Sequence, residues 1–169
     1  VEPGGGQFSL FSRNATGVSL LLFGSTGPDG TCEEIRLDPA VNKTGDVWHI
    51  WVAGVRHGEL YGYRIDGPYE PSAGRRFNRN KLIIDPYARA VTGNFQWDLS
   101  DARGYDPDSP EGDLSFSTRD SAPGAPRAIV LASNIQSASR PLNIPYADAV
   151  IYELHLKGFT AHASSSVHH

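Results

Sequence analysis

The sequence predicts an all-β protein whose main part is an antiparallel sandwich of two sheets. Its 169 residues include 18 glycines and 12 prolines, which divide the chain into short segments rich in β-branched and aromatic residues. Several segments alternate apolar and polar residues, which is the period of a strand with one buried face. Turn sequences such as Thr44-Gly45-Asp46 and Asp66-Gly67-Pro68 separate them. We therefore expect one sandwich over residues 5–93.

Five strands are expected in this sandwich, and their apolar faces indicate its core. The expected strands are residues 7–11, 18–23, 33–37, 47–52 and 60–65. Because successive side chains of a strand point to opposite faces, Trp48 and Trp51 lie on different faces, whereas Tyr61 and Tyr63 share one. Large apolar rings are usually buried, so we assign Trp48, Tyr61 and Tyr63 to the core.

The amino-acid composition of the chain changes after the sandwich. Residues 94–145 are rich in Asp, Ser, Gly and Pro and read as a loop and linker, with one short strand expected at residues 128–131. Residues 149–155 are apolar almost throughout, as in a strand of a parallel sheet that is covered on both faces. We therefore divide the chain into residues 1–93, 94–145 and 146–169.

The composition excludes several classes of partner. The chain has 15 Lys and Arg against 19 Asp and Glu, without a basic surface of the kind that binds nucleic acid. Its longest apolar run, residues 20–23, is too short to cross a membrane. The single Cys32 allows no intramolecular disulfide and gives no metal-ligand spacing, so we expect no metal and no cofactor. A neutral substrate or a protein partner is favoured.

Residues 80–88 read as a structural motif. Pro86 fixes its own φ and restricts Asp85 to extended conformations, so a strand should end sharply there. The carboxylate of Asp85 is then placed to cap the following turn.

Four motifs, in this order along the chain, resemble isoamylases and glycogen debranching enzymes of the α-amylase superfamily (glycoside hydrolase family 13). They are residues 8–20, residues 47–68 with Leu60-Tyr61-Gly62-Tyr63-Arg64-Ile65-Asp66-Gly67-Pro68, residues 77–90 with Lys81-Leu82-Ile83-Ile84-Asp85-Pro86-Tyr87-Ala88, and Ile151-Tyr152-Glu153-Leu154-His155-Leu156-Lys157-Gly158-Phe159-Thr160. The chain is most similar to plant and algal isoamylases.

The resemblance implies a fold and a reaction. The fold is an immunoglobulin-like antiparallel β-sandwich of the early set, like carbohydrate-binding module 48, followed by a linker and the first strand of a truncated (β/α)8 barrel. The reaction is hydrolysis of α-1,6 branch points in starch or glycogen by a retaining mechanism with two carboxylates. In such barrels these carboxylates follow later strands, so we expect no catalytic residue in this chain and no activity from it alone. Glu153 and His155 are therefore read as packing residues.

The resemblance also bears on glucan binding. The related glycogen-binding module of AMP-activated kinase uses two tryptophans with a lysine between them. The matching positions here are the loop 24–30, which has no aromatic residue, Gly62 at the lysine position, and Tyr69 near the second tryptophan. We expect at most weak glucan binding, with Tyr69 and Trp51 as the candidate glucan-binding residues.

The implied partners are α-glucans (amylopectin, phytoglycogen and malto-oligosaccharides), the protein's own catalytic barrel, and a homo-oligomeric or isoamylase-like subunit. Similarity to plant and algal enzymes implies a plastid (chloroplast), and any other source implies the cytoplasm. Two readings of another class stay open, namely a non-catalytic isoamylase-like subunit and an independent glucan-binding module. Among enzymes, a bacterial glycogen debranching enzyme or a trehalose-releasing relative also stays open.

Overall fold

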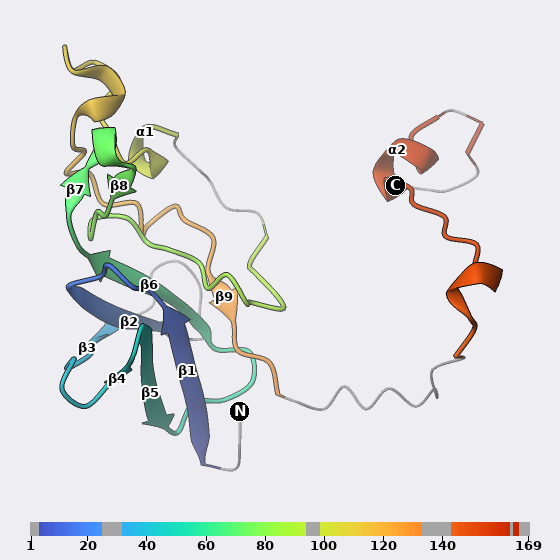
Figure 1. Ribbon diagram of the computed structural model, residues 1–169, viewed down its shortest axis with the longest axis horizontal. Coiled ribbons are helices and arrows are strands. Elements are labelled where there is room, and N and C mark those ends of the chain that lie inside the picture. The colour runs from blue at the N-terminus through green and yellow to red at the C-terminus, as the bar shows by residue number, and fades with distance from the viewer. Residues whose placement is uncertain (1–3, 25–31, 94–98, 133–142, 163, 166–169) are drawn as a thin grey trace. The chain divides into compact units, whose positions relative to one another are not determined.

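The computed structural model describes residues 4–24, 32–93, 99–132, 143–162 and 164–165. The chain forms two compact units, Val1–Asn134 and Ile135–His169, which are described separately (Figure 1).

The first unit is an antiparallel sandwich (Figure 1), which confirms the predicted fold class. One sheet has the order β1-β5-β4, with β1 at Gly5–Phe11, β5 at Val47–Ala53 and β4 at Lys43–Thr44. The other has the order β3-β2-β6-β9, with β3 at Cys32–Arg36, β2 at Gly17–Phe23, β6 at Leu60–Asp66 and β9 at Ala128–Ile129. A small ribbon pairs β7 (Tyr69–Glu70) with β8 (Arg75–Arg76). The five predicted strands are all present, and the two-residue strands β4, β7 and β8 were not predicted.

The core lies between the two sheets and contains the rings that the sequence assigned to it. Trp48 and Tyr63 are each 1% exposed and Tyr61 is 8% exposed, whereas Trp51 on the opposite face of β5 is 50% exposed. Phe8 meets Tyr61 edge-on, with ring centroids 5.1 Å apart. Burying each large apolar side chain contributes about 1.5–3 kcal/mol, so this cluster is a main source of stability.

The outer face of the β3-β2-β6-β9 sheet is also covered. Leu21 and Phe23 of β2 pack there with Leu82 and Ala122, which come from the chain that follows the sandwich strands. Backbone hydrogen bonds join Ile83 to Tyr63 in both directions, at 2.8 and 2.9 Å. β2 is therefore buried on both faces, which explains its almost continuous apolar sequence.

Residues 99–132, expected as loop and linker, pack against the sandwich. They contain α1 (Leu99–Ala102), the 3₁₀ turn η2 (Gly112–Leu114) and β9, which pairs with β6. The η1 turn (Pro71–Ala73) joins β7 to β8. Four polar residues of the 99–132 segment are buried, namely Ser115, Ser117, Ser121 and Arg127. Polar contacts rather than an apolar period hold this segment, and the proposed division into domains stays a prediction.

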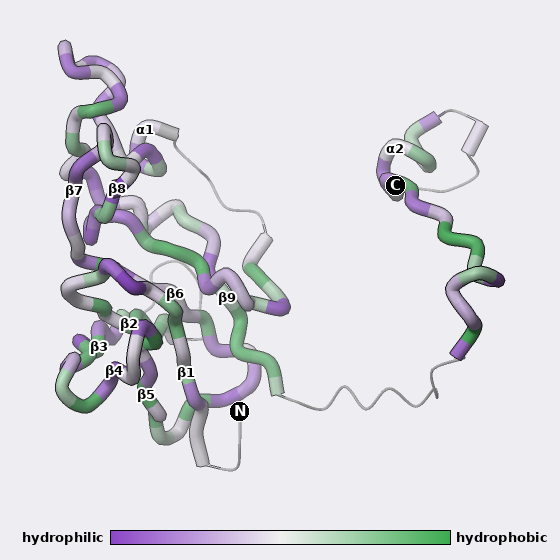
Figure 2. Tube along the Cα trace, in the orientation of Figure 1, coloured by the Kyte–Doolittle hydropathy of each residue, from purple (hydrophilic) through white to green (hydrophobic). Residues whose placement is uncertain are grey.

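The second unit has little regular structure among its described residues. It contains the 3₁₀ turn η3 (Tyr146–Asp148) and α2 (Leu156–Thr160), and the hydrophobic stretch between them is exposed (Figure 2). Val150 is 93% and Ile151 71% exposed. Residues 149–155, where the first barrel strand was expected, form no strand here, since a strand needs a neighbour with which to form a ladder. The barrel strand therefore stays a prediction. No helix among the described residues is long and apolar enough to cross a membrane.

Candidate functional site

The two predicted glucan-binding residues lie on different parts of the sandwich unit. Trp51 is on the outer face of β5, and Tyr69 is in the β7-β8 ribbon, at the other end of the unit (Figure 1). The structure therefore does not bring them together. Of the loop 24–30, which was matched to the first tryptophan of the kinase module, residues 25–30 lie outside the described residues, as do residues 94–98 and 133–142 of the expected linker.

Gly62, the position that the sequence matched to the lysine of the kinase module, is covered by the chain itself. A Cβ at Gly62 would lie 2.8 Å from Leu82 Cδ1 and 3.3 Å from the Ile83 carbonyl oxygen. No side chain fits there without displacing Leu82, so a lysine at this position could not reach a sugar. The structure gives a physical reason for the glycine that replaces the lysine.

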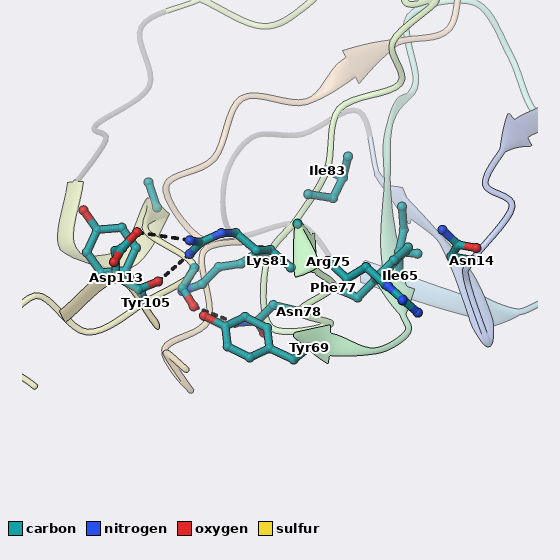
Figure 3. Close-up of a pocket in the computed structure, with 14 residues that line it drawn as sticks. Asn14, Ile65, Tyr69, Arg75, Phe77, Asn78, Lys81, Ile83, Tyr105 and Asp113 are labelled. Atoms are coloured by element: carbon teal, nitrogen blue, oxygen red, sulfur yellow. Dashed lines mark hydrogen bonds and ion pairs between the residues drawn. The ribbon is translucent and has the colours of Figure 1, made fainter. Parts of the chain in front are cut away.

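Tyr69 lines a cavity of about 880 Å³, within the range of small-molecule sites (Figure 3). Aromatic rings of Tyr69, Phe77 and Tyr105 contribute to its wall, together with the polar side chains of Arg76 and Asn78. Rings and planar polar groups are the combination that sugar recognition requires.

Most of the polar groups in this wall already have protein partners. The Tyr69 hydroxyl donates to the Ser115 carbonyl, and its ring meets Phe116 edge-on with centroids 4.8 Å apart. Arg76 Nη2 lies 3.1 Å from Asp113 Oδ2. The Asn78 amide donates to the Ser117 carbonyl at 2.8 Å. The cavity is therefore built by contacts that attach residues 104–117 to the β7-β8 ribbon.

Lys81 is the centre of these contacts. It is 6% exposed, and its ammonium donates to the carbonyls of Asp101 and Arg119, both at 2.7 Å, and to Ser117 Oγ at 3.2 Å. Burial lowers the pKa of Lys81 because the charged form loses its hydration. The three acceptors lie in α1 and in the irregular stretch at residues 117–119, so one side chain holds both parts of the segment on the sandwich.

A second polar contact attaches the 99–132 segment to β6 of the β3-β2-β6-β9 sheet. Arg64 donates from Nη2 to both oxygens of Asp120 at 2.8 Å and from Nη1 to the Arg79 carbonyl at 2.8 Å. Burial acts to raise the pKa of Asp120, but hydrogen bonds from Arg64 and the Ala122 N–H outweigh it, and the pKa is lowered.

The turn prediction at Asp85 is confirmed. Its Oδ1 accepts a hydrogen bond from the Tyr87 N–H at 2.8 Å, and its Oδ2 accepts one from the Tyr61 hydroxyl at 2.8 Å. Burial, and then the Asp85 carboxylate, raise the pKa of Tyr61. Asp85 thus stabilises the turn of the motif at residues 80–88 and also holds the hydroxyl of the core residue Tyr61.

The buried polar contacts of Lys81 and Asn78 were not predicted from the sequence. One signal was available, because a lysine that begins the apolar run Leu82-Ile83-Ile84 is placed to be carried into the interior. Its acceptors are backbone carbonyls about 20 and 38 residues later, and carbonyls leave no mark in a sequence.

Comparisons with known proteins give the family. Residues 1–88 match the family model of carbohydrate-binding module 48 (isoamylase N-terminal domain). The chain is 37% identical to isoamylase 1, chloroplastic, of Oryza sativa subsp. japonica, over 98% of this chain and 19% of that protein. It is 42% identical to a glycogen debranching enzyme of Serratia proteamaculans, over 94% of this chain and 22% of that protein. The chain thus spans about a fifth of the length of these relatives.

Solved structures support the fold. A pullulanase from Anoxybacillus sp. LM18-11, solved with maltotetraose, aligns with a TM-score of 0.58 at 22% identity, over 99% of this chain and 19% of that chain. A pullulanase mutant from Paenibacillus barengoltzii, complexed with maltotriose, aligns with a TM-score of 0.56 at 20% identity, over 99% of this chain and 20% of that chain. Because the family model matches more than half of the chain, the chain belongs to the carbohydrate-binding module 48 family of isoamylase N-terminal domains.

Proposed function

We propose that this chain is the N-terminal part of a debranching enzyme that hydrolyses α-1,6-glucosidic branch points in starch-type or glycogen-type glucans. The observation that carries the proposal is an identity of 37–42% to isoamylases and glycogen debranching enzymes over more than nine-tenths of the chain. In this proposal the sandwich precedes a (β/α)8 barrel, whose later strands supply the nucleophile and the acid/base carboxylate.

An activity assay tests this proposal. Residues 1–169 and the full-length parent protein are incubated separately with amylopectin, and new reducing ends are measured against a buffer control. We expect reducing ends from the parent and none from the chain alone. Release by the chain alone would place catalytic residues within it. An inactive parent that raises the activity of a partner isoamylase would support a non-catalytic subunit instead.

The glucan-binding residues and the location in the cell are also proposals. We place the glucan contacts of the module at Trp51 and Tyr69, because each ring lies at a surface or a cavity of the sandwich. For a plant or algal source we place the parent in the plastid, since the rice and maize relatives are both chloroplastic isoamylases. Immunoblotting of isolated plastids with an antibody against the sandwich tests the location.

A further inference from the structure

The β1-β5-β4 sheet has an outer face that no described segment covers. Six of its outward residues form three neighbouring cross-strand pairs, Gln7 with Trp51, Ser9 with His49, and Phe11 with Val47. Trp51 is 50% and Phe11 60% exposed. We call these six residues the open face, in contrast to the covered outer face of the other sheet.

The indole of Trp51 is held in place although half of it is exposed. Gly5, on the neighbouring strand, has no side chain, and a Cβ there would lie 2.7 Å from Trp51 Cζ2 and would collide with the Val52 carbonyl oxygen. The benzo edge of the indole therefore occupies the space above Gly5. A ring that is fixed before a ligand arrives loses little conformational entropy on binding.

Neutral polar groups surround this ring. Gln7 lies directly opposite Trp51, so their Cβ atoms are about 4.5–5.5 Å apart. His49 lies two residues before Trp51 on the same face, about 7 Å away along the strand, and its Nε2 is 2.9 Å from Thr44 Oγ1. Ser9, opposite His49, adds a hydroxyl. Lys43 is directed to the other face, where its ammonium lies 4.8 Å from the centre of the Trp48 ring.

None of the six open-face residues carries a fixed charge, so an anionic or cationic ligand would find no countercharge among them. A pyranose ring has an apolar face of C–H groups and a rim of hydroxyls, and it matches an aromatic ring bordered by amide, hydroxyl and imidazole groups. We propose that the open face binds a linear segment of an α-glucan, with one glucose ring stacked on Trp51 and its hydroxyls hydrogen-bonded by Gln7 and His49. The choice of an α-glucan rests on the proposed function.

The experiment is a titration of ¹⁵N-labelled chain 1–169 with maltoheptaose, followed by the indole N–H signals of its tryptophans. Trp51→Phe assigns the Trp51 signal. We expect this signal to shift and to saturate with a dissociation constant of about 1 mM, because a single stacked ring supplies only a few kcal/mol. Isothermal titration calorimetry measures the affinity of the variants, which lack the Trp51 signal: Trp51→Ala should weaken binding about tenfold, whereas Trp51→Phe should keep most of it. Leu114→Ser, at an exposed residue of η2, serves as the matched control, and cellohexaose tests the linkage.

Each alternative result overturns the inference in an identifiable way. A binding heat without a shift at Trp51 would place the glucan elsewhere, and an equal response to cellohexaose would remove the α-glucan specificity. A Trp51 signal that shifts with protein concentration in the absence of sugar would assign the open face to a second copy of the chain. Absence of binding while the parent debranches amylopectin would reject the inference alone. Binding through Trp51 by a parent without debranching activity would reject only the proposed function.

Discussion

The two sheets of the sandwich share one core but differ on their outer faces. Between them, the inner faces bury Trp48, Tyr61 and Tyr63. On the outside, the β3-β2-β6-β9 sheet is covered by Leu82 and Ala122, whereas the β1-β5-β4 sheet presents Trp51 to solvent. The path of the chain after β6 thus decides which outer face of the sandwich is exposed to solvent.

The difference can be followed in the two central strands. In β5 one face is turned to the core, with Trp48 buried and Ile50 and Val52 partly buried, while Val47, Trp51 and Ala53 on the other face are exposed. β2, by contrast, is buried at six of its seven positions. The covering segment is not strongly apolar. It is held by Lys81, by the Arg64–Asp120 pair, and by Ser121 Oγ, which accepts the Leu82 N–H at 2.8 Å. The covered face therefore depends on polar contacts at its edge, and the predictions below test this dependence.

Lys81→Met should have the largest effect on stability. The substitution removes three charged hydrogen bonds and leaves the buried carbonyls of Asp101 and Arg119 without their donor. This loss is larger than the desolvation energy that is saved when the buried ammonium is removed. We expect a loss of about 3 kcal/mol, or a melting temperature lower by about 10 °C, measured by urea denaturation and calorimetry. Limited proteolysis should then cleave within residues 99–121. Lys157→Met, at an exposed lysine, is the control, and equal stability of both variants would show that Lys81 does not hold the segment.

Gly62→Ala should have the next largest effect. The added methyl would lie 2.8 Å from Leu82 Cδ1, so Leu82 or the strand must move. Overpacking of this kind costs about 1–3 kcal/mol, and chemical denaturation would measure it. Because the clash is with one side chain, the double variant Gly62→Ala/Leu82→Ala should lose less than the sum of the two single losses. Simple additivity would mean that Leu82 does not occupy the space above Gly62.

Asp120→Asn should cost about 1 kcal/mol at neutral pH, since the pair is partly exposed and screened. The folded pKa of Asp120 is lowered, so the stabilisation is complete above its ordinary pKa of 3.8 and is lost as the pH falls through the folded value. The difference between wild type and variant should therefore shrink in strong acid. Urea denaturation at pH 7 and at low pH measures it, and a gap that is independent of pH would reject a role for the Asp120 charge.

The sequence predicted the sandwich, its core rings and the placement of Trp48 and Trp51 on opposite faces of β5, because side-chain alternation is a local property of a strand. It also predicted the cap at Asp85, which depends on residues two positions apart. It did not predict that residues 99–132 cover a sheet, because the stabilising contacts join Lys81 and Arg64 to partners 20 to 56 residues away. Tyr69 and Trp51 were selected from the sequence as aromatic rings, without knowledge of their neighbours. The sequence therefore could not indicate that Tyr69 lines a cavity whose polar groups already have protein partners, or that Trp51 lies on an exposed face.

Ser9→Val on the open face should have the smallest effect, although it adds one heavy atom, as Gly62→Ala does. Ser9 is exposed on β1 opposite His49, so the larger side chain extends into solvent and displaces no described neighbour. A β-branched residue also suits an exposed strand position, and we expect a change within about 0.5 kcal/mol, with a slight gain favoured. Parallel urea titrations of Ser9→Val and Gly62→Ala compare the two outer faces directly. A loss at Ser9 as large as the loss at Gly62 would mean that the β1-β5-β4 sheet is covered in solution, and the contrast between the two faces would then be wrong.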